Sequence, residues 1–297
     1  MSNLKQDGFR PVVRTLEGVA TSDGAGVALT RVIGSPALDM LDPFLLLDEF
    51  RSDRPGDYIA GFPDHPHRGF ETVTYLLAGR MRHEDNQGHA GVIEAGGIQW
   101  MTAGRGIVHS EMPEQDDGLL WGFQLWVNLP ADEKWVAPGY REYPAAAIPV
   151  EERDAGVVIR VIAGETAQGT AGPVTGVSTQ PLYLDVTLGN GGVLAEPLAL
   201  SHNAFLYVFE GAINVVAGRG DGQGDGDGDG DARIEAGKLA VLGSGARVHI
   251  VGDGVSNRFL LVAGKRLNEP VARAGPFVMS TRQEVMDAFQ DFREGRF

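Results

Sequence analysis

Short runs that alternate between apolar and polar residues, separated by glycine-containing turns, recur along most of this chain. Successive side chains of a β-strand point to opposite faces, so such runs indicate half-buried strands. Many short strands joined by turns are typical of β-sandwiches and barrels, so the pattern predicts an all-β protein. The predicted strands are Val73–Leu77, Gly91–Glu94, Leu120–Asn128, Val157–Ile162, Leu182–Leu188, Phe205–Phe209, Ala212–Val216, Leu239–Leu242 and Phe259–Ala263.

One segment near the end of the chain has helical spacing instead. Apolar side chains recur from Val285 to Phe292 at intervals that place them on one helix face. Ser280 and Thr281, followed by Gln283 and Glu284, form overlapping capping-box patterns. The sequence therefore predicts one short helix whose apolar stripe packs on a barrel.

The strand pattern is duplicated. The strand–turn–strand sequence TVTYLLAGRM at 72–81 has a counterpart in FLYVFEGAINV at 205–215. Likewise, EAGGIQWMTAG at 94–104 is matched by EAGKLAVLGSG at 235–245. Two copies of one unit, roughly 140 residues apart, indicate an internal repeat. We interpret the segment 130–153, which is rich in Pro and Ala, as the linker.

The repeat divides the chain into two predicted domains. The 297 residues are enough for two domains of ordinary size. We expect residues 1–145 to form the first domain, and residues 146–297 to form the second domain together with the helix.

Two pairs of polar residues carry the candidate chemistry. His65 and His67 are separated by one residue on a predicted strand, as are His109 and Glu111 about forty residues later. Residues at this spacing share one strand face, so each pair can direct two side chains to one point. Two antiparallel strands would then supply three imidazoles and one carboxylate, a protein ligand set for a divalent transition metal.

The remaining histidines do not show this spacing. His202 and His249 are isolated in the second half of the chain, and we interpret both as ordinary structural residues. His83 and His89 lie between the two pairs, where a polar-surface or turn role is favoured. Arg68 should point away from the ligand face by strand alternation, so we expect it to form a salt bridge rather than to act in catalysis.

Composition narrows the possible functions further. The chain has no cysteine, which excludes disulfides, Fe–S clusters and thiolate metal sites. Its net charge of −15 repels nucleic-acid phosphates, so direct DNA or RNA binding is not expected. Five of the acidic residues lie in the Gly-Asp segment at 218–231. Such repeats occur in Ca²⁺ sites, but the apolar spacing of a β-roll is missing, which favours a solvated, flexible loop.

Nothing in the sequence indicates a membrane or a secretory route. The first ten residues contain no apolar core of a signal peptide, and no apolar run approaches the roughly 20 residues of a membrane span. We expect a cytoplasmic protein that does not associate with membranes.

The motifs resemble those of a known family, the pirins. The resemblance rests on GFPDHPHRGFETVTYLLAG at 61–79, QWMTAGRGIVHSEMP at 99–113, LWVNLP at 125–130 and PLYLDVTL at 181–188, and it extends through most of the chain. Pirins belong to the cupin superfamily. The resemblance thus implies two tandem cupin barrels, each a double-stranded β-helix or jelly roll, with a short C-terminal helix.

The resemblance also implies which residues hold a metal. Matched to the family's motifs, the ligands are His65, His67, His109 and Glu111, all in the N-terminal barrel, while the C-terminal barrel is metal-free. Many other cupins use the glutamate of the first motif, here Glu71. In pirins the ligand is the glutamate two residues past the last histidine. We therefore expect Glu71 either to support the ligands from outside the ligand set or to have a structural role.

The resemblance further implies a metal-dependent dioxygenase of the quercetin 2,3-dioxygenase type, which opens a flavonol ring with O₂. In such an enzyme Glu111 would serve as ligand and proton acceptor. The alternatives are a regulatory protein that binds a transcription factor or metabolic enzyme through an iron redox switch, and a purely structural metal barrel. Fe(II) is the metal that the family implies, although Zn, Mn, Ni, Co and Cu also accept nitrogen and oxygen ligands. We expect a monomer.

Three further residues are candidates for the substrate pocket. Phe62, Gln124 and Trp126 lie on or beside the strands that carry the motifs, so they could line the mouth of the pocket. Packing in the protein core is an equal alternative for the two aromatic residues.

Overall fold

The computed structural model describes residues 8–217 and 231–297, which form β-strands, four short 3-10 helices and one α-helix. Almost all of the Gly-Asp segment lies outside this range. The helices are η1 (Pro55–Asp57), η2 (Ala131–Glu133), η3 (Ala145–Ala147), η4 (Asp154–Gly156) and α1 (Arg282–Arg293). None of the helices in the described part of the chain is long and apolar enough to cross a membrane.

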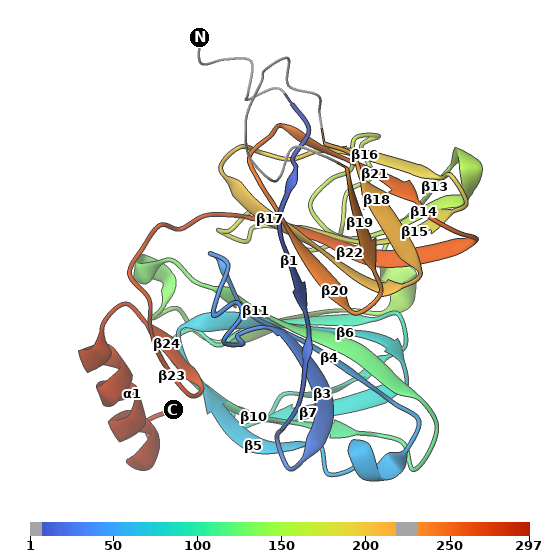
Figure 1. Cartoon of the computed structure of the whole chain (residues 1–297). Helices are drawn as coiled ribbons and strands as arrows, with labels where there is room; N and C mark the ends of the chain where they lie inside the picture. The colour runs from blue at the N-terminus through green and yellow to red at the C-terminus, as the bar shows by residue number, and fades with distance from the viewer. Residues whose placement is uncertain (1–7, 218–230) are drawn as a thin grey trace. The chain divides into compact units, whose positions relative to one another are not determined.

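The chain folds into two compact units (Figure 1). We call residues 19–147 and 267–297 the first barrel, and residues 1–18 and 148–266 the second barrel. Each unit contains a seven-stranded and a four-stranded antiparallel sheet, and the first barrel also carries a small two-stranded sheet. These are the two cupin barrels that the sequence predicted.

The larger sheet of the first barrel has the strand order β12-β9-β6-β11-β4-β3-β2, and the smaller has the order β5-β10-β7-β8. The strands are β2 (Val19–Asp23), β3 (Val27–Ile33), β4 (Phe44–Ser52), β5 (Phe62–His67), β6 (Phe70–Ala78), β7 (Arg80–Asp85), β8 (Ala90–Glu94), β9 (Ile98–Thr102), β10 (Ile107–Pro113), β11 (Leu120–Asn128) and β12 (Gly139–Tyr143).

The second barrel repeats this topology, with the orders β1-β20-β17-β22-β15-β14-β13 and β16-β21-β18-β19. In strand order β6 corresponds to β17 and β9 to β20, which confirms the internal repeat. The strands are β1 (Val12–Glu17), β13 (Val150–Arg153), β14 (Val157–Ala163), β15 (Leu182–Gly189), β16 (Val193–Pro197), β17 (His202–Glu210), β18 (Ala212–Val215), β19 (Ala232–Glu235), β20 (Lys238–Leu242), β21 (Arg247–Gly252) and β22 (Ser256–Lys265).

A hydrophobic core fills the second barrel. A continuous cluster of buried aliphatic and aromatic side chains, including Leu206, Phe259 and Leu261, forms the core of the second barrel. Its two histidines make local contacts: the His202 ring hydrogen-bonds the Gln180 carbonyl at 2.9 Å, and His249 packs against Phe9. These contacts agree with the structural roles expected for both histidines.

The helix α1 is capped as predicted. The Thr281 hydroxyl accepts a hydrogen bond from the Glu284 amide, and the Glu284 carboxylate accepts one from the Thr281 amide at 2.8 Å. The helix packs Val285 and Ala288 against the hairpin of β23 (Ala272–Ala274) and β24 (Phe277–Met279).

The boundaries of the two units differ from the predicted domains 1–145 and 146–297. Strand β1 pairs with β20 of the second barrel, whereas residues 267–297, including α1, return to the first barrel. The expected linker 130–153 contains β12, which pairs with β9, so most of it belongs to the first barrel. Local pattern cannot reveal such exchanges, because strand pairing between distant segments decides them.

Lys134 is a buried cation in the first barrel. Its ammonium group donates to the carbonyls of Gly69 and Val278, at 2.8 and 3.0 Å, and to Asn128 Oδ1 at 2.7 Å. These bonds join the η2 segment to the turn between β5 and β6 and to β24. Burial lowers the pKa of Lys134 to about 8.

This lysine makes the stability of the protein depend on pH. Its pKa is lower in the folded chain, so between about pH 8 and 10.5 the unfolded chain binds the extra proton and stability rises with pH. We expect the lysine to contribute a rise of at most about 3 kcal/mol to the free energy of unfolding across this window. Urea unfolding of wild type and Lys134→Met at several pH values measures the difference, and identical pH profiles would contradict the prediction.

Candidate metal centre

The first histidine pair lies on the edge strand β5. This strand tolerates Pro63 and Pro66, because an edge strand needs amide donors on one side only. It pairs with β10 so that His109 lies directly opposite His65 and Ile107 opposite His67. A register shift follows, after which Glu111 is opposite Phe62. The pairing thus brings together two motifs that lie about forty residues apart.

The three imidazoles converge on one point. The ring centroid of His65 lies 4.7 Å from that of His67 and 4.4 Å from that of His109, and the third pair is 5.1 Å apart. One ring nitrogen from each lies within 4.8 Å of the others. A single ion could therefore contact all three residues.

The protonation state of the rings suits metal binding. His65 Nδ1 donates to the Pro63 carbonyl at 2.9 Å, which leaves the Nε2 lone pair free. Burial, followed by repulsion from the neighbouring histidines, holds the pKa of His67 and His109 well below the usual range. Both are therefore neutral imidazoles, the form that binds a metal.

His109 gives the clearest evidence that a ligand belongs here. It is fully buried, and neither of its ring nitrogens has a hydrogen-bond partner among the described residues. Buried polar atoms without partners are rare in folded proteins. A divalent metal would satisfy the nitrogen that faces His65 and His67, so the residues present fit a bound ion.

Glu111 lies beside this group but is not a member of it. Its buried carboxylate accepts a hydrogen bond from Gln124 Nε2 at 3.0 Å, and the Thr74 hydroxyl lies 2.9 Å from Oε1. Thr74 is on β6 and Gln124 on β11, so the large sheet holds the carboxylate in place. The role of Glu111 as a fourth ligand remains a prediction.

Glu71 lies elsewhere in the barrel. Its carboxylate accepts a hydrogen bond from the Thr102 hydroxyl at 2.7 Å, on the adjacent strand β9. Burial raises the pKa of this carboxyl. Glu71 belongs neither to the histidine group nor to the wall of the neighbouring cavity.

The site opens into a cavity of about 540 Å³, large enough for a drug-sized organic molecule. His65, His67 and Glu111 form one part of its wall. The structure also places all three pocket candidates on the wall, namely Phe62, Gln124 and Trp126. The Trp126 ring packs edge-on against His67 with centroids 5.1 Å apart, so it borders both the ligands and the cavity.

Two arginines on this wall are absent from the sequence-based prediction. Arg31 forms a two-pronged ion pair with Asp48, at 2.9 and 2.7 Å, across β3 and β4. Arg273 comes from β23, and its guanidinium lies 5.0 Å from the centroid of the Trp126 ring. Nothing in the local pattern marks Arg31, and Arg273 was assigned to the other domain.

The structure also tests the expectations for three polar residues near the motifs. Arg68 forms the expected ion pair, with Asp291 at 2.7 Å. His89 is exposed in a turn and contacts Asp85 at 2.8 Å, as expected. The prediction for His83 is wrong, because the residue is only 2% exposed and contacts the carboxylate of Glu142. On β7 it lies opposite Glu111, facing the interior of the barrel.

Comparison with known proteins agrees with this geometry. The family model of pirin matches residues 26–127, and that of the pirin C-terminal cupin domain matches residues 183–297. A pirin-like protein of Caulobacter vibrioides is 54% identical over 97% of this chain and 99% of its own length. The chain belongs to the pirin family.

Two further proteins are similar over nearly the whole chain. A Pseudomonas aeruginosa protein, provisionally named a quercetin 2,3-dioxygenase, is 47% identical over 97% of this chain and 98% of its own length. The crystal structure of a quercetin 2,3-dioxygenase from Acinetobacter baumannii has a TM-score of 0.85 and 32% sequence identity, covering 97% of this chain and 98% of the other.

Proposed function

We propose that this pirin-family protein is a metal-dependent dioxygenase that opens the ring of flavonol-like substrates, as quercetin 2,3-dioxygenases do. The observation that carries the proposal is the convergence of three imidazoles next to a cavity, beside a buried carboxylate. The names of the similar proteins from Pseudomonas and Acinetobacter support the choice of reaction.

In this proposal His65, His67 and His109 hold one divalent metal, with Glu111 as the fourth ligand. When bound, the metal supplies Lewis-acid activation of a substrate hydroxyl and redox chemistry toward O₂. Three neutral imidazoles and one carboxylate leave positions open on a six-coordinate ion. We propose Fe(II) as the native metal, and the same ligand types also accept Zn, Mn, Ni, Co and Cu.

The protein's own residues would bind and deprotonate the substrate. Phe62 and Trp126 offer apolar surfaces against which a planar ring system can pack. Glu111 would accept the proton of the substrate hydroxyl, while Gln124 and Thr74 hold its carboxylate in position. The walls of the cavity would exclude bulk water around the reacting ring.

Oxygen consumption tests the proposal directly. The protein is loaded with Fe(II) under anaerobic conditions and then mixed with quercetin in air-saturated buffer. It should consume one O₂ and release one CO for each quercetin converted. Metal-free protein is the control and should consume none. Absence of O₂ uptake with quercetin and related flavonols, for every metal tried, would rule out this activity. Metal-dependent binding of a partner protein without turnover would instead favour the regulatory alternative.

A further inference from the structure

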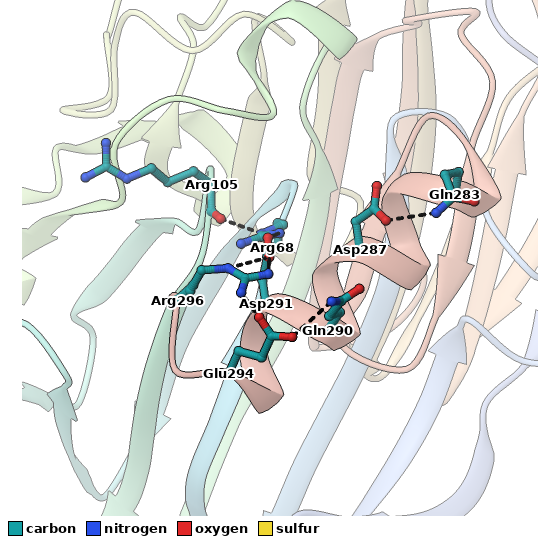
Figure 2. A network of polar contacts seen from close by, with 8 residues as sticks. All are labelled: Arg68, Arg105, Gln283, Asp287, Gln290, Asp291, Glu294 and Arg296. Atoms are coloured by element: carbon teal, nitrogen blue, oxygen red, sulfur yellow. Dashed lines mark hydrogen bonds and ion pairs between the residues drawn. The ribbon is translucent and has the colours of Figure 1, made fainter.

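Arg68 links the metal site to the C-terminal part of the chain. It follows the proposed ligand His67 directly, just after the end of β5, and its side chain is buried, with 3% exposed. Its Nε donates to the carbonyl of Arg105, in the turn that leads into β10 and His109. Its guanidinium also donates to Asp291 of α1 at 2.7 Å (Figure 2).

Backbone hydrogen bonds tie the same point of β5 to the C-terminal hairpin. The Arg68 amide donates to the Pro276 carbonyl at 3.3 Å, and the Val278 amide donates to the Arg68 carbonyl at 3.0 Å. Pro276, Gly275 and Arg273 in turn line the cavity. Residues 267–297, which we call the C-terminal clasp, therefore bond to the residue next to the proposed ligand His67 and form part of the cavity wall.

The charges in this contact are well matched. Asp291 also accepts a hydrogen bond from Arg296 Nε at 3.0 Å, and the two arginines hold the pKa of its carboxyl below the usual range. The Phe297 ring lies 4.2 Å from the Arg68 guanidinium and shields it. Loss of Asp291 would leave the buried Arg68 guanidinium without an ion-pair partner, which is costly, whereas loss of Arg68 would leave Asp291 paired with Arg296. The pair is therefore suited to hold the clasp firmly.

We propose that Arg68 and Asp291 are positioning residues. Their ion pair holds the C-terminal clasp against β5, and the clasp in turn fixes the orientation of His67 and keeps the cavity wall closed beside it. The inference rests on metal binding by His65, His67 and His109, as in the proposed function, but it does not require dioxygenase turnover.

The helix offers matched controls. Gln283 donates to Asp287 at 2.8 Å within α1, and Gln290 donates to the C-cap residue Glu294 at 2.9 Å (Figure 2). Asp287→Asn removes the same charge from the same helix as Asp291→Asn, but it leaves the contact with Arg68 intact. Asp291→Glu keeps the charge and can restore the ion pair.

The rate at which Ni²⁺ is released into excess chelator measures how tightly the protein holds the metal. Changes to residues that orient metal ligands typically cost 10- to 100-fold in affinity, so we expect Asp291→Asn to release Ni²⁺ about tenfold faster than wild type. Asp287→Asn should match wild type, and Asp291→Glu should lie close to it. Arg68→Gln should accelerate release as well, and the double variant should show little further effect, because both residues act through one contact.

Hydrogen exchange of the metal-free protein gives a second readout. Peptides that contain the Arg68 and Val278 amides should exchange faster in Asp291→Asn than in Asp287→Asn, because the clasp protects them. Equal Ni²⁺ release by Asp291→Asn and wild type, or equal acceleration by Asp287→Asn, would overturn the proposal. If the wild-type protein bound no Ni²⁺, the proposed metal centre would be overturned, and so would the proposed effect of the ion pair on metal release. The exchange data would still decide whether the ion pair holds the clasp.

Discussion

Replacement of His109 by alanine is expected to abolish metal binding. His109 is the histidine of the proposed ligand set that comes from β10, and its ring centroid lies 4.4 Å from that of His65 and 5.1 Å from that of His67. It is neutral and fully buried, so no solvent-exposed group can take its place. Since changes to residues around a metal site already cost up to about 100-fold, loss of a direct ligand should weaken binding by more than about 100-fold. Elemental analysis after Fe(II) or Ni²⁺ loading, together with calorimetric titration, measures this.

His83→Ala is the matched control for this variant. His83 is buried in the same barrel but contacts Glu142 and does not belong to the histidine group. The control should retain one metal per chain, although both substitutions remove a buried imidazole. If His109→Ala kept full metal content while remaining folded, the proposed centre would be wrong.

Glu111→Gln is expected to cause a large loss of quercetin turnover. This change preserves the size of the side chain but removes its charge and its ability to accept a proton. It also brings an amide close to Gln124, whose Nε2 now donates to the carboxylate. General-base groups typically contribute 10²- to 10⁴-fold to rate, so turnover of quercetin should fall by about that range. The rate of O₂ uptake by the Fe(II)-loaded variant measures the loss.

Glu71→Gln separates the two possible carboxylate ligands. Glu71 is also buried and hydrogen-bonded, to Thr102, but it does not line the cavity. Its replacement should leave metal content unchanged and turnover close to that of wild type. The opposite pattern, with metal lost in Glu71→Gln and full turnover kept in Glu111→Gln, would assign the carboxylate role to the first motif.

Much of the site could be predicted because its information is local. Residues i and i+2 of a strand share a face, so the spacing of His65 with His67 and of His109 with Glu111 already indicates which side chains can meet. The family resemblance then placed both pairs in one barrel. The capping box of Thr281 and Glu284 is equally local, and the helix begins where it predicted.

His83 shows where single-residue reasoning failed. It has no second histidine at strand spacing, and the sequence therefore predicts a surface role. Its burial results from the pairing of β7 with β10, which turns His83 toward the interior opposite Glu111. Alternation along β7 shows that two faces exist, but only the neighbouring strand decides which of them is inside.

The sequence by itself determined the all-β class, the internal repeat, the helix and the four candidate ligands, because periodicity and short spacing follow from strand and helix geometry. Only the tertiary structure decided that β1 joins the second barrel and that residues 267–297 close the first. It alone showed that Arg273 and Pro276 line the cavity and that Asp291 pairs with Arg68. These contacts join residues more than two hundred positions apart to the metal strands, and long-range pairing leaves no local pattern in the chain.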